Sequence, residues 1–148
     1  MRSLLFVLFI SLSFYPLIQE HISRGTPKEC IESFFKSFHE QDTSELKSVI
    51  HEEIVVGTII HDQKDTTLKV DNAHALYASL ASIPDTLNFE ESLLSIEVKE
   101  DGVLAHVWTP YEFYVNGEKS HQGVNAFTLL NTGEGWKIIY LVDTRRRE

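Results

Sequence analysis

The sequence has 148 residues and a hydrophobic content of 43%, which is the size and composition of one folded domain and excludes a disordered chain. Its formal net charge of −9 argues against nucleic acid as a partner, because nucleic-acid binding needs a basic face. The lone cysteine, Cys30, excludes an intrachain disulfide and any CxxC metal or redox motif.

The start of the chain is typical of a signal peptide. Arg2 supplies the positive charge, and residues 4–15 form an apolar run shorter than the roughly 20 residues of a membrane-spanning helix. No A-x-A pattern follows, so the cleavage position stays open within residues 13–22. We predict a signal peptide at 1–22, a domain at 23–148, and export from a bacterium to the periplasm or medium, with no stable membrane anchor afterwards. The alternative is an uncleaved amphiphilic anchor.

Three helix starts are marked by capping residues, at Thr26, Asp42 and Asp71. Thr26 precedes a proline suited to the first helical position, and Glu29 closes a capping box. Two of these starts precede apolar positions at helical spacing, namely Ile31, Phe34, Phe35 and Phe38, and then Ala73, Leu76, Tyr77 and Leu80.

Strands are predicted between and after the helices. The β-branched run at 54–60 indicates a strand, in which Gly57 marks a bulge or a close neighbour. Residues 61–65 are predicted to form a polar loop. Residues 87–98 alternate in hydropathy, but the phase slips at 93–94, which predicts one long strand with a bulge.

Residues 103–145 predict a three-stranded meander. Asn116-Gly117 is the signature of a two-residue hairpin turn, and Gly133 and Gly135 mark a longer second turn. Helices grouped on one side of an antiparallel sheet form an α+β layer fold. A long, bulged sheet curls, so we expect about three N-terminal helices to cover a curved antiparallel sheet, forming a cone with an internal cavity.

The element order and the C-terminal motifs resemble the NTF2-like superfamily, including its SnoaL-like and lumazine-binding-like bacterial members. The resemblance is carried by Tyr111, Phe113, Asn116, Gly117, Ser120, His121, Gly123, Phe127, residues 135–138, Thr144 and Arg145. It implies the cone fold. It does not imply one activity, because the superfamily contains isomerases, dehydratases, cyclases, transport adaptors and binding domains.

The hairpin register predicts which residues share a face. If Asn116 and Gly117 form the loop, Glu112 faces His121. The set predicted on that face is His106, Trp108, Glu112, His121, Asn125 and Phe127. Pro110 leaves the register open, because a bulge there would move the residues beyond it to the opposite face.

Candidate catalytic residues follow from this register. Glu112 and His121 as neighbours predict a carboxylate–imidazole pair suited to general acid/base chemistry; the alternative is an exposed ion pair. Asp143 is a candidate base and Tyr111 a candidate hydroxyl donor, although an Asp143–Arg145 pair that holds the terminus is the simpler interpretation. The candidate ligand-binding residues are His106, Trp108, Asn125, Phe127 and Arg145.

The function predicted from these features is an exported domain that binds a small hydrophobic or aromatic ligand in its cavity, with no assigned reaction. The alternative is a small-molecule lyase or isomerase that uses acid/base residues in the cavity. A homodimer through the open sheet face is expected. No metal is predicted, because the histidines show neither H-x-x-x-H nor HExxH spacing, and no cofactor is predicted.

Overall fold

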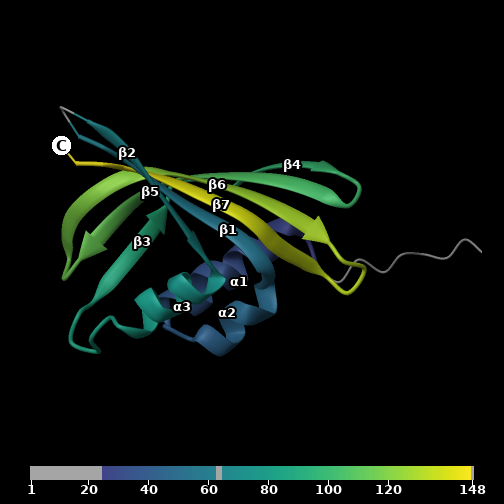
Figure 1. The fold of residues 1–148 in the computed structure, drawn as a ribbon, viewed down its shortest axis with the longest axis horizontal. Coiled ribbons are helices and arrows are strands. Elements are labelled where there is room, and N and C mark those ends of the chain that lie inside the picture. The colour runs from purple at the N-terminus through teal and green to yellow at the C-terminus, as the bar shows by residue number, and fades with distance from the viewer. Residues whose placement is uncertain (1–24, 63–64, 148) are drawn as a thin grey trace, which may run out of the picture.

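The computed structural model describes residues 25–62 and 65–147; the predicted signal peptide lies outside them. All three helices pack on one side of a curved, seven-stranded sheet (Figure 1). The helices are α1 (Pro27–His39), α2 (Thr43–Val49) and α3 (Ala73–Ala81), and the strands are β1 (Ile50–His61), β2 (Thr66–Asn72), β3 (Phe89–Leu93), β4 (Glu97–Asp101), β5 (Leu104–Val115), β6 (Glu118–Asn131) and β7 (Trp136–Arg146). No described helix is long and apolar enough to cross a membrane.

The helices begin at capping residues, two of them as predicted. Thr26 Oγ1 accepts a hydrogen bond from the Glu29 amide at 3.2 Å, while Glu29 accepts one from the Thr26 amide at 2.7 Å. Asp42 caps α2. The third prediction is wrong by one residue, because Asn72 caps α3 and accepts the Ala75 amide at 3.0 Å.

The sheet was predicted to be antiparallel, but it is mixed. Its order is β2-β1-β7-β6-β5-β3, with β4 also pairing with β5, and β1 runs parallel to β7. Sequence patterning missed β2, an edge strand whose side chains are almost all exposed, so burial imposes no clear pattern on it. The predicted strand 87–98 is two strands that both pair with β5, and its phase slip marks the break between them.

The β5–β6 register differs from the prediction by one residue. Val115 pairs with Glu118 as expected, but Ser120 is an extra residue in β6, so His121 pairs with Phe113 and Glu112 pairs with Gln122. Pro110 pairs with Val124 without a bulge. Side chains alternate between the two faces along a strand. From His121 onward, each β6 residue therefore lies on the opposite face from the β5 residue that was predicted to pair with it.

The core lies between α1 and the inner face of β5–β7. Phe127 on β6 is fully buried, and its ring packs edge-on against Phe34 and Phe35 of α1, with centroids 5.5 and 6.0 Å away. Cys30 lies in the same core, where its thiol donates to the Trp136 carbonyl at 3.4 Å. These contacts anchor α1 on the sheet. An open space remains between the helices and the sheet on the side of α3 and the β2 edge.

Candidate functional site

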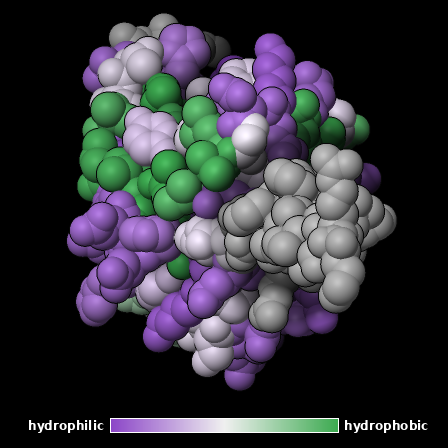
Figure 2. Space-filling view, turned by 90° about the vertical axis from the view of Figure 1, so that its right-hand side faces the viewer, coloured by the Kyte–Doolittle hydropathy of each residue, from purple (hydrophilic) through white to green (hydrophobic). Residues whose placement is uncertain are grey.

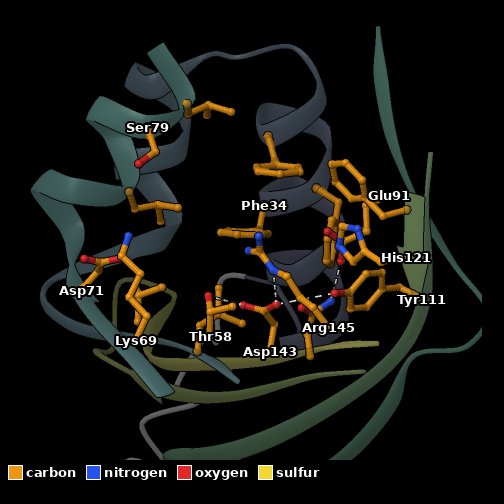
Figure 3. Close-up of a pocket in the computed structure, with 18 of the residues that line it drawn as sticks. Phe34, Thr58, Lys69, Asp71, Ser79, Glu91, Tyr111, His121, Asp143 and Arg145 are labelled. Carbon is orange, nitrogen blue, oxygen red and sulfur yellow. Dashed lines mark hydrogen bonds and ion pairs between the residues drawn. The ribbon is translucent and has the colours of Figure 1, made fainter. Parts of the chain in front are cut away.

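A cavity of about 360 Å³ lies between the helices and the inner face of the sheet (Figure 3). Its two sides differ in chemistry. The helical side is mostly apolar and includes Phe34, Phe35, Phe38, Leu76, Leu80 and Ile83. The polar groups of the strands are Thr58, Lys69, Asp71, Glu91, Tyr111, His121, Asn125, Asp143 and Arg145.

Asp143 is the centre of one polar cluster. Its carboxylate is buried and accepts hydrogen bonds from the Thr58 hydroxyl and Arg145 Nε, each at 2.7 Å. The parallel β1–β7 register places Thr58 beside Asp143, and strand alternation places Arg145 on the same face. The Tyr111 hydroxyl donates to the Thr144 carbonyl at 2.9 Å and lies 3.5 Å from the Asp143 carboxylate. Burial, followed by the nearby carboxylates, raises the pKa of Tyr111, so this hydroxyl stays protonated.

Glu91 on β3 is the centre of a second cluster. Its carboxylate accepts a hydrogen bond from Asn125 Nδ2 at 2.6 Å, and the same nitrogen lies 3.2 Å from the Thr109 hydroxyl. The Glu91 amide donates to His39 Nε2 at 3.0 Å, so this nitrogen carries no proton. Burial raises the pKa of Glu91 to about 7, Asp143 adds to the rise, and the Asn125 hydrogen bond opposes it. Glu91 is therefore a cavity carboxyl that exchanges its proton near neutral pH.

His121 forms part of the aromatic side of the cavity. Its ring stacks on Phe113, with centroids 4.8 Å apart, and contacts the Tyr111 ring edge-on at 5.9 Å. Burial, followed by the charge of Arg145, lowers the pKa of His121. The imidazole is therefore mostly neutral at pH 7 and adds little positive charge to the cavity.

Five of the nine predicted site residues line this cavity. They are Tyr111, His121, Asn125, Asp143 and Arg145. Phe127 lies in the core behind α1 and is not among the lining residues. The predicted roles of all these residues remain predictions.

The other three predicted residues, Glu112, His106 and Trp108, lie on the outer face. The predicted Glu112–His121 pair is wrong because of the extra residue in β6. Glu112 instead accepts hydrogen bonds from the Tyr114 hydroxyl at 2.7 Å and Lys119 at 2.9 Å, which lower its pKa. His106 is exposed, and Trp108 pairs with Ala126.

Sequence reasoning missed Glu91 and Thr58 as site residues. Both had a usable signal. Glu91 shares the parity of Phe89, and Thr58 shares that of Val56, and each of these apolar residues is buried. A polar residue in phase with buried neighbours faces the interior, where it meets either a hydrogen-bond partner or a cavity.

Glu91→Gln is expected to remove a pH dependence of stability. The folded pKa of Glu91 lies above that of an unfolded glutamate, so folding favours the protonated form. The free energy of unfolding of the wild type should therefore fall as pH rises from about 4.5 to about 7. The contribution of Glu91 to this fall is roughly 3 kcal/mol, and above pH 7 this carboxyl causes no further loss.

Urea unfolding at pH 5, 6, 7 and 8 measures this effect. Glu91→Gln should match the wild type near pH 5 and exceed it at pH 8, since glutamine carries no charge and can still accept the Asn125 hydrogen bond. Glu90→Gln is the matched control on the same strand, with an exposed side chain. A difference between Glu91→Gln and wild type that stays constant across this range would contradict the assignment.

No group of three or more His, Cys, Asp or Glu side chains within 25–62 and 65–147 is placed to hold a metal ion. No protein-family model matches the sequence, and the comparison with curated proteins finds no match. Many solved structures, in contrast, match the fold of this chain.

Three helices against a curved, unclosed mixed sheet define a class of α+β cone folds. An NTF2-like protein from Cytophaga hutchinsonii superposes with a TM-score of 0.64 at 11% identity, covering 80% of this chain and 94% of its own. A candidate dehydratase of the NTF2-like family from Streptomyces avermitilis gives 0.60 at 16% identity, covering 82% and 94%. A protein of unknown function with a cystatin-like fold, from Nostoc punctiforme, gives 0.63 at 8% identity, covering 82% and 89%. The chain has the NTF2-like fold.

Proposed function

We propose that the cone cavity binds a small molecule with a largely apolar body and one polar end. The observation that carries the proposal is that one cavity combines an apolar lining with hydrogen-bonding groups. The apolar residues lie mostly on the helices, with Val56, Ile60, Phe113 and Leu141 on the strands, and the hydrogen-bonding groups lie almost all on the strands. Small-molecule sites have this composition, and a volume of about 360 Å³ lies at the lower end of their usual range of roughly 300–1,000 Å³.

A bulky residue at the cavity should block binding. Ser79 on α3 lines the cavity and is exposed, so Ser79→Trp fills space without disturbing the core. We expect at least about a tenfold loss of affinity for 1-naphthol, a fluorescent probe with an apolar body and one hydroxyl, because its site is occupied. Ala78→Trp is the control, since Ala78 is exposed on the same helix and does not line the cavity. Equal titration curves for Ser79→Trp and wild type would overturn the proposal.

Glu91 favours a second candidate function, a lyase or isomerase working by acid/base chemistry. General acids and bases work best with a pKa near the working pH, and burial places that of Glu91 at about 7. In this proposal Glu91 transfers the proton, while the hydrogen bonds with Asn125 and His39 fix its position. The description of the Streptomyces avermitilis protein as a candidate dehydratase supports this class of reaction.

The catalytic candidate is tested by α-proton exchange of small carbonyl compounds in D₂O, followed by NMR. Wild type should accelerate the exchange of at least one compound, and Glu91→Gln should slow it by at least about a hundredfold. Equal exchange in both proteins would remove Glu91 from the reaction.

We further propose that the open sheet face forms a homodimer. Figure 1 shows all helices on the other face. A row across the outer face runs from Trp108 through Ala126, Val142 and Gly57 to Val70. Trp108 and Val70 are 43% and 60% exposed. On the side of the molecule that faces the viewer in Figure 2, apolar side chains also gather in a surface patch. Such a row on one face indicates a protein interface.

Trp108→Lys is expected to convert the dimer to a monomer. A lysine within this apolar row would place an unpaired charge from each protomer in the interface, which is costly to bury. Light scattering coupled to size exclusion should show the halved mass, whereas Glu118→Lys, at the exposed hairpin end of β6, should remain dimeric. A wild-type protein that is monomeric at every concentration would refute the dimer.

We also propose export, on the strength of Arg2 and the apolar run that follows it. Mass spectrometry of the protein from its source bacterium should find a mature N-terminus within or just after residues 13–22. An intact Met1 would overturn the proposal.

A further inference from the structure

Arg145 brings two terminal nitrogens to the cavity that donate to no described residue. Resting on the proposed ligand-binding function, we propose that the ligand is a small apolar carboxylic acid. Its carboxylate binds the terminal nitrogens of Arg145, and binding takes up one proton at Glu91.

Arg145 supplies the donors. A guanidinium carries five N–H groups, and Asp143 accepts the one on Nε at 2.7 Å. Within residues 25–62 and 65–147, no group accepts a hydrogen bond from its two terminal nitrogens. Figure 3 shows the guanidinium extending from the sheet into the cavity toward Phe34. Two parallel N–H groups match the two oxygens of a carboxylate.

The other polar groups of the sheet side are largely committed to the protein. The hydroxyls of Thr58 and Tyr111 donate to Asp143 and to the Thr144 carbonyl, and the Asn125 amide nitrogen donates to Glu91. The ligand's polar end therefore meets mainly the donors of Arg145, which call for an acceptor group. The aromatic helical side, led by Phe34 and Phe38, receives the hydrocarbon body.

The charges of the cavity require that a proton accompany the carboxylate. Asp143 already neutralises Arg145, and Lys69 pairs with Asp71 at 2.7 Å, so an ionised Glu91 and a bound carboxylate would be two uncompensated negative charges. A protonated Glu91 removes one charge and donates its O–H to the ligand. Burial already makes this form accessible near pH 7.

The ionisable groups around Glu91 come from four elements. They are His39 on α1, Tyr111 on β5, His121 on β6, and Asp143 and Arg145 on β7. Burial lowers the pKa of both histidines from 6.5, and burial raises that of Tyr111, so all three are mostly neutral between pH 7 and 8.5. A proton taken up in this range is therefore assigned to Glu91.

The test is calorimetric titration of the full-length protein with benzoate, methyl benzoate and benzylamine. These probes share one ring and differ in charge. Benzoate should bind at least about tenfold more tightly than the other two. Titrations in HEPES and Tris at pH 7.0, 7.75 and 8.5 should show proton uptake, and the affinity for benzoate should fall by up to about tenfold per pH unit above the pKa of Glu91.

Two variants separate the parts of the proposal. Arg145→Gln should lose the preference for benzoate over methyl benzoate. Glu91→Gln should still bind benzoate, because glutamine donates an N–H where the protonated acid donates an O–H, but its proton uptake and pH dependence should vanish. Circular dichroism verifies that each variant is folded, and the selectivity and proton uptake of the wild type test the proposal independently of either variant.

The outcomes distinguish this inference from the proposed function. Suppose that methyl benzoate or benzylamine binds the wild type as tightly as benzoate, and that Ser79→Trp weakens the binding of that probe and of benzoate. The cavity then binds ligands without selecting a carboxylate, and the inference is overturned. Benzoate binding without proton uptake overturns it too. If 1-naphthol and all three probes fail to bind the wild type, the proposed function itself falls.

Discussion

Replacing Gly123 with alanine should destabilise the protein by more than about 3 kcal/mol, beyond the usual range for an overpacked side chain. A Cβ at this position would lie 1.7 Å from the Thr144 carbonyl oxygen and 2.9 Å from the Tyr111 ring. The carbonyl is backbone and accepts the Tyr111 hydroxyl at 2.9 Å, so it cannot move without disturbing the cavity. The clash is therefore relieved only by separating β6 from β7.

Gly57→Ala is the matched control, because Gly57 also lies within a strand. Its Cβ would lie 3.0 Å from a methyl group of Val142, which is the end of a side chain that can adjust. Urea unfolding monitored by tryptophan fluorescence should give a much smaller loss for this variant, about 1 kcal/mol. Similar losses for both glycines would show that the Thr144 carbonyl on β7 does not lie against Gly123 on β6.

Phe127→Ala should cost about 3–5 kcal/mol of unfolding free energy, because the side chain is fully buried between the sheet and α1. Its edge-on contacts with Phe34 and Phe35 would be lost together with the buried area. Chemical denaturation at equilibrium measures the loss.

Phe127→Leu distinguishes a core residue from the ligand-binding residue that the sequence predicted. This change keeps most of the apolar volume and should cost about 1.5 kcal/mol or less. It should leave the affinity for 1-naphthol unchanged, since Phe127 does not line the cavity. A folded Phe127→Leu variant with lost affinity would restore the ligand-binding role.

Local signals predicted the elements whose geometry is set by neighbouring residues. The capping box at Thr26 and Glu29 and the Asn116-Gly117 turn are of this kind, and the structure confirms both. The NTF2-like cone also follows from the element order. The parallel β1–β7 pairing was not predicted, because it joins strands far apart in sequence and no local pattern specifies it.

The candidate site was only partly predictable because it depends on register. One extra residue, Ser120, moved His121 away from Glu112 and toward Phe113. Neither Ser120 nor its immediate neighbours Lys119 and His121 is a glycine or a proline that would mark the bulge. Asp143 and Arg145 were paired correctly because they lie two positions apart on one strand. Glu91 shares the parity of buried Phe89, which indicates that it faces the interior, but its partner Asn125 lies on a strand distant in sequence, so no local pattern joined the two in one site.

The position of Cys30 has a practical consequence for chemical labelling. Its thiol is buried between α1 and the sheet, and burial raises its pKa to about 12, so almost no thiolate forms at neutral pH. The native chain is thereby protected from oxidative cross-linking between copies. A second cysteine introduced on the surface would be the sole reactive thiol, which permits site-specific attachment of a fluorophore without first removing the natural one.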